Sequence, residues 1–73
     1  MVFRDVNMKE IRDGHIIHNG CDKNSFQEVR KINGKLWFGK EGTYPTDDNN
    51  DWVEMNDSFQ FEMFWQIVND NFA

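Results

Sequence analysis

Three residues with zinc-binding side chains stand three positions apart in the stretch HIIHNGC. His15, His18 and Cys21 supply imidazole and thiol groups, which are common protein ligands of zinc. Their spacing argues against one shared site. Residues an odd number apart on a strand point to opposite faces, and the Asn19-Gly20 pair disfavours a helix that would align them. A small zinc-binding module that uses His18 and Cys21 remains an alternative hypothesis for the function.

A second candidate metal site is the stretch TDDNNDW, which has the oxygen-rich character of a calcium loop. An EF-hand loop needs oxygen ligands at positions 1, 3 and 5, glycine at position 6 and glutamate at position 12. Asp47, Asn49 and Asp51 fit the first three positions, but Trp52 and Ser58 occupy the last two. The residues that would make the turn and the strongest ligand are missing. We therefore predict no bound metal or other cofactor here, and a solvated loop is the simpler interpretation.

Charge is distributed unevenly along the chain, which has 73 residues and a formal net charge of −5. Residues 1–40 contain eight Lys or Arg against five acids, a net of +3, whereas residues 41–73 contain eight acids and no Lys or Arg, a net of −8. Two outcomes are open at this stage. Folding could interleave the two halves so that the charges cancel, or the acids could form a surface field that attracts basic proteins.

The second outcome predicts a protein-binding surface in the acidic half. Carboxylates in such a field attract basic protein surfaces and compete with phosphates for the same Lys and Arg side chains. An aromatic anchor within a charged rim is a common arrangement at binding hot spots. The residues that we expect to contact a partner are Asp47, Asp48, Asp51, Trp52, Glu54 and Asp57. The predicted function is therefore inhibition of a basic partner protein by occlusion.

Small size, acidity and the lack of catalytic motifs together make the chain similar to the acidic inhibitors that phages produce against host enzymes. That group includes nucleic-acid mimics and anti-CRISPR proteins, and the similarity implies a binding protein without enzymatic activity. No P-loop, GxSxG or HExxH motif is present. The eight acids of the second half would repel a polyanion, so direct nucleic-acid binding is not expected. No apolar run approaches the ~20 residues of a membrane span, and a cytoplasmic location is expected.

The elements that must position these residues fit a single α+β domain over residues 1–73, with a small antiparallel sheet of three to four strands. The stretch VNMKEIRDG predicts a short N-terminal helix with Asn7 as its N-cap. An Asn33-Gly34 turn between two β-prone runs predicts a hairpin. The expected pairs are Ile32 with Lys35, Arg30 with Trp37, and Val29 with Phe38. The stretch DWVEM predicts a further short strand.

A C-terminal aromatic helix over residues 58–71 is predicted from apolar residues at helical spacing, capped by Asp57 or Ser58. Its core-facing residues would be Phe61, Phe64, Trp65, Val68 and Phe72. A second apolar ridge on this helix would consist of Phe59, Met63 and Ile67. Because a terminal helix needs only one apolar face, the ridge leaves a second hypothesis open. The predicted N-terminal helix is the simplest cover for the ridge, but a second copy of the chain or a partner could also cover it. If a second copy does, the chain is a structural protein that self-associates, as a homodimer through this ridge or through its oppositely charged halves.

Overall fold

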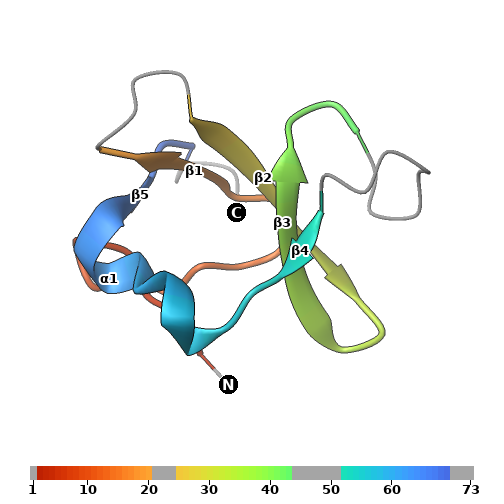
Figure 1. The fold of residues 1–73 in the computed structure, drawn as a ribbon, viewed down its shortest axis with the longest axis horizontal. Coiled ribbons are helices and arrows are strands. Elements are labelled where there is room, and N and C mark those ends of the chain that lie inside the picture. Colours follow the sequence, from red (N-terminus) through yellow and green to blue (C-terminus); the bar gives the residue numbers. More distant parts are fainter. Residues whose placement is uncertain (1, 21–24, 44–51, 70–73) are drawn as a thin grey trace.

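The computed structural model describes residues 2–20, 25–43 and 52–69 of the chain. These residues form one antiparallel five-stranded sheet in the order β4-β3-β2-β1-β5 (Figure 1). The strands are β1 Ile16–Asn19, β2 Phe26–Ile32, β3 Lys35–Lys40, β4 Val53–Glu54 and β5 Trp65–Ile67. A 3₁₀-helix spans Asp57–Phe59 and the short helix α1 spans Phe61–Phe64. The fold is α+β with the sheet dominant, and it has more strands than the three to four predicted.

The hairpin between β2 and β3 confirms the prediction made from its turn residues. Asn33 and Gly34 have φ of 53° and 80°, and a type I′ turn requires positive φ at both of these positions. The predicted register is observed for all three pairs, namely Ile32 with Lys35, Arg30 with Trp37, and Val29 with Phe38. The predicted short strand is also present as β4, which pairs with β3.

The core lies on the inner face of the sheet, where the N-terminal segment and α1 cover it. Phe38 of β3 is central, with ring centroids 4.9 Å from Phe59, 5.5 Å from Phe61 and 5.7 Å from Trp65. All three contacts are edge-on, which aromatic pairs prefer to face-to-face stacking. The buried core residues are Phe3, Ile11, Ile17, Val29, Phe38, Met55, Phe61, Trp65 and Ile67. Aromatic rings thus fill much of the interior of this small domain.

The N-terminal segment forms no helix, so the prediction of one is wrong. Met8 has a φ of 65°, which lies in the left-handed region and interrupts any helix at that residue. Asp5, not Asn7, organises the segment. Asp5 Oδ1 accepts from the backbone N–H groups of Asn7 at 2.9 Å and Lys9 at 3.0 Å. This side-chain-to-backbone pattern stabilises a turn where the sequence resembles a helix start.

The C-terminal segment is helical only in part, in place of the predicted continuous helix. Asn56 caps its first turn, because Asn56 Oδ1 accepts from the N–H of Ser58 at 2.9 Å. Gln60 has a φ of 51° and separates the 3₁₀-helix from α1. At Trp65 the backbone becomes extended and joins β1 as β5. Aromatic and β-branched residues favour a strand here, and β1 would otherwise present a free edge.

The change from helix to strand also removes the predicted ridge. Phe59 packs against Phe38 of the core, and Ile67 is buried within β5. Met63 is 61% exposed and is the one ridge residue that faces solvent. The prediction that Phe59, Met63 and Ile67 form one apolar face is therefore wrong, and a homodimer through that face has no structural basis.

Candidate functional site

The acidic residues of the second half lie exposed on several elements. In the part of the chain that the structure describes, these acids are Glu41 after β3, Glu54 in β4, Asp57 in the 3₁₀-helix and Glu62 in α1. None of their carboxylates forms an ion pair with a Lys or Arg of the described residues. Unpaired, solvent-exposed carboxylates leave a negative potential that can act on a partner.

The described acids of the first half, in contrast, all have partners. Glu10 forms an ion pair with Arg12, with 3.5 Å between Oε1 and Nη2. Glu28 is buried on β2, where it forms an ion pair with Arg30 and accepts from the N–H of Gly42 at 3.3 Å. The ion pairs between described residues therefore join basic and acidic residues of the first half only. Folding does not cancel the described acids of the second half.

One basic residue does lie close to two of these acids. Arg4 lines the same surface groove as Asp57 and Glu62. Its guanidinium Nη1 donates to the carbonyl oxygen of Met8 at 3.1 Å. Arg4 is thus held by the backbone of its own loop, and it leaves both carboxylates available.

Trp52 has a different place from the exposed anchor that the sequence predicts. Its side chain is buried, at 7% exposure, and its indole ring covers Gly39 of β3. The indole Nε1 donates to Thr43 Oγ1 at 2.8 Å. A strand glycine leaves room for close approach of another group, and here the ring fills that room. Trp52 therefore supports the sheet just before β4 begins.

The structure places two of the six predicted partner-binding residues on an exposed surface, namely Glu54 and Asp57. Asp47, Asp48 and Asp51 lie outside the described residues. Glu62 was not predicted as a site residue, because the expected continuous helix gave its carboxylate no special position. Its place in α1, beside the groove of Asp57, adds it to the exposed acids.

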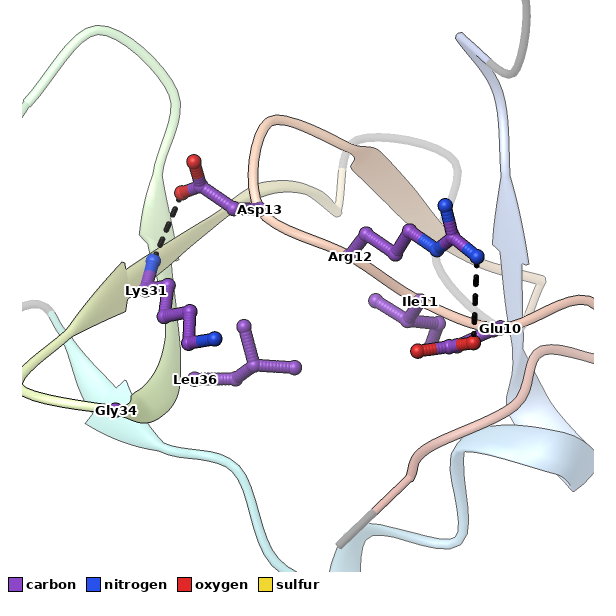
Figure 2. A pocket seen from close by; sticks show the side chains of 7 residues that line it. All are labelled: Glu10, Ile11, Arg12, Asp13, Lys31, Gly34 and Leu36. Carbon is purple, nitrogen blue, oxygen red and sulfur yellow. Dashed lines mark hydrogen bonds and ion pairs between the residues drawn. The ribbon is translucent and has the colours of Figure 1, made fainter. Parts of the chain in front are cut away.

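Another surface groove lies between the N-terminal segment and the β2–β3 hairpin, with a volume of about 500 Å³ (Figure 2). Glu10 and Arg12 pair on one side of it. On the other side Asp13 Oδ1 accepts from the backbone N–H of Lys31 at 2.8 Å. Figure 2 shows the Lys31 side chain pointing into the groove above Leu36. The charges of this groove are mixed, and none of its lining residues is His, Cys or Ser.

The two histidines are not brought together as zinc ligands. His15 is buried, and its Nδ1 accepts from the N–H of Arg12 at 2.8 Å. His18 pairs with Phe26 across β1 and β2, with 4.5 Å between the ring centroids. Cys21 lies outside the described residues. Among the residues that the structure does describe, no cluster of three His, Cys, Asp or Glu could hold a metal ion.

Comparisons with protein-family models, with curated proteins and with solved structures find no match to this chain. Within the described residues, no helix has the length and apolar character needed to cross a membrane. The function must therefore be inferred from the surface described above.

Proposed function

We propose that this chain is a small acidic protein-binding module that docks on a basic surface of another protein and inhibits it by occlusion. The observation that carries the proposal is the difference between the two halves of the chain. In the basic half, Glu10 and Glu28 form ion pairs with Arg12 and Arg30. The described acids from Glu41 onward stay exposed and unpaired. Their charge is therefore left for a partner.

Glu54 and Asp57 form the described part of the proposed docking surface, and Asp47, Asp48 and Asp51 extend it on sequence grounds. Carboxylates at this density compete with phosphates for Lys and Arg. A nucleic-acid-binding surface is therefore a suitable target, as for the nucleic-acid mimics and anti-CRISPR proteins of phages. The proposed action is non-catalytic and takes place in the cytoplasm.

The test begins with a tagged pull-down from cell lysate, washed at low and at high salt, to name the partner. Affinity for that partner is then measured for the triple variant Asp47→Lys, Asp48→Lys, Asp51→Lys and for the double variant Glu54→Lys, Asp57→Lys. Both variants should lose more than about ten-fold in affinity, since each reversal replaces an attraction with a repulsion. Unchanged affinity in folded variants would overturn the proposal.

A matched control is Glu10→Lys, which reverses an exposed acid of the basic half that already pairs with Arg12. This variant should bind as the unmodified protein does. Equal losses in the control and in the second-half variants would show that only net charge matters, and that no particular surface is used.

A further inference from the structure

The outer edge of β4 has a defined backbone geometry. Glu54 of β4 pairs with Trp37 of β3, and the N–H of Met55 donates to the carbonyl oxygen of Leu36 at 2.9 Å. Hydrogen-bonded and non-hydrogen-bonded pairs alternate along an antiparallel ladder. Since the pair of Leu36 and Met55 is hydrogen-bonded, the pair of Trp37 and Glu54 is not. The N–H and C=O of Glu54 therefore point away from β3, toward the edge of the sheet.

These two backbone groups have no partner among the described residues. Unpaired N–H and C=O groups at a sheet edge are a template for an added strand. The side chains of β4 add chemical selectivity. Val53 is 44% exposed although its pairing places it beside buried Phe38 on the inner face. Glu54 is exposed on the opposite face, so the edge alternates an apolar and an acidic position.

A groove of about 270 Å³ lies at the end of β4 and has an apolar floor. Phe3, Leu36 and Met55 line it, together with Lys35 and Glu54. Because three of its lining side chains are apolar, the groove suits an apolar side chain of a partner. A basic side chain is better placed next to Glu54 on the outer face, or near exposed Asp57.

We propose that an extended, basic segment of the partner protein adds to the sheet alongside β4, with Lys or Arg next to Glu54 and an apolar residue next to Val53. This inference rests on the proposed acidic docking function and specifies how the partner binds. A second copy of the chain fits less well. An antiparallel pair in which both copies use Glu54 would place two carboxylates opposite each other, which is destabilising.

The test uses a short blocked peptide of alternating Lys and Val as the probe. Glu54→Pro removes the outward N–H but leaves the bonds to β3, since proline is tolerated where an edge N–H faces solvent. Glu54→Gln removes the charge and keeps the N–H, so it is the matched control. We expect Glu54→Gln to weaken binding about five-fold and Glu54→Pro to weaken it more than about twenty-fold, because the strand can no longer pair. Urea unfolding curves check that both variants are folded before binding is measured.

A second probe keeps the result interpretable if Glu54→Pro loses its fold. An N-methylated peptide of the same sequence has the same charge but cannot donate to a ladder, and it should bind at least about ten-fold more weakly to the unmodified protein. Equal binding of both peptides would overturn strand addition and leave acidic docking in place.

Polylysine separates the two proposals. If polylysine binds and the alternating peptide does not, strand addition is overturned and acidic docking stands. If neither binds, both proposals are overturned. Sedimentation of the protein alone tests whether a second copy occupies the edge. A dimer that the Glu54→Pro substitution dissociates would identify a second copy as the occupant. That result would overturn the proposal of a basic partner segment.

Discussion

The two edges of the sheet end in opposite ways. At the β5 edge, three of the four outward backbone groups of Trp65 and Ile67 have partners within the chain. Asp5 Oδ2 accepts from the N–H of Ile67 at 3.0 Å, and the N–H of Val6 donates to the carbonyl oxygen of Trp65 at 2.9 Å. The N–H of Trp65 itself donates to the carbonyl oxygen of Phe61. At the β4 edge, no described residue bonds to the outward groups of Glu54.

The difference shows that one buried carboxylate can accept the edge N–H that a neighbouring strand would otherwise bind. Asp5 is fully buried and accepts three backbone N–H groups, from Asn7, Lys9 and Ile67. A carboxylate can accept several hydrogen bonds at once, so it satisfies a loop and a strand edge together. Among the residues that the structure describes, the β4 edge has only its shortness and the charge of Glu54 to protect it. Closure of one edge therefore directs strand pairing to the other.

The largest effect on the difference between the two edges is expected when the Asp5 carboxylate is removed. Asp5→Ala leaves one buried and two part-buried N–H groups without their acceptor and should lower the free energy of unfolding by about 3–5 kcal/mol. Asp5→Asn keeps one oxygen for the loop but turns a donor toward Ile67, so it should cost roughly half as much. Urea unfolding measures both. Asp13→Ala, at an exposed carboxylate that accepts from one backbone N–H, serves as the control and should cost less than about 1 kcal/mol.

An intermediate effect is expected from Gly39→Ala, which concerns the support of the β4 edge. A Cβ on Gly39 would lie 2.6 Å from Cγ of Trp52. The indole ring would have to move, at a cost of about 1–3 kcal/mol. Tryptophan fluorescence should shift toward that of an exposed ring. Gly20→Ala, where an added Cβ meets nothing within 4 Å, should leave the emission unchanged, and an equal shift there would contradict the assignment of this contact.

A smaller loss is expected from Asn69→Ala, next to the closed edge. Asn69 Oδ1 accepts from the N–H of Ile16 at 2.6 Å, and Nδ2 donates to the carbonyl oxygen of Gly14 at 3.1 Å. Loss of both bonds at this half-buried site should cost about 1–2 kcal/mol. Amide hydrogen exchange at Ile16 should become faster, whereas Val29 in the middle of the sheet should keep its protection. Unchanged exchange at Ile16 would show that water replaces the side chain without cost.

The smallest effect is expected at the open edge itself. Val53→Thr changes an exposed side chain that satisfies no backbone group of the sheet edge. It should alter the free energy of unfolding by less than about 0.5 kcal/mol. Thermal unfolding checks this value. A loss comparable with that of Asp5→Ala would mean that the β4 edge is also covered, and the contrast between the two edges would disappear.

The local features of the fold could be predicted from the sequence, and the distant ones could not. The hairpin register follows from Asn33-Gly34, because a two-residue turn fixes the pairing of the strands on both sides. The role of Asp5 depends on Ile67, which is 62 positions away, and no local pattern indicates that bond. The continuous C-terminal helix predicted from the spacing of apolar residues is not formed, because Trp65–Ile67 pair with β1 as a strand.

Some features of the candidate site could likewise be predicted from the sequence, and others could not. The exposure of Glu54 and Asp57 could be expected from their charge. The burial of Trp52 could not, since it depends on a glycine thirteen positions earlier in β3. The outward direction of the Glu54 backbone follows only once the pairing of β4 with β3 is known.

The bond between Asp5 and Ile67 also constrains the order of folding. Contacts between distant residues form late, because a long loop must close before they contribute. The β2–β3 hairpin closes over two residues and can form early, whereas the sheet is completed only when residues near both ends of the described chain meet. During synthesis, the sheet stays incomplete until Ile67 has emerged from the ribosome. Binding at β4 that depends on the complete sheet therefore begins only after Ile67 has emerged and paired with β1.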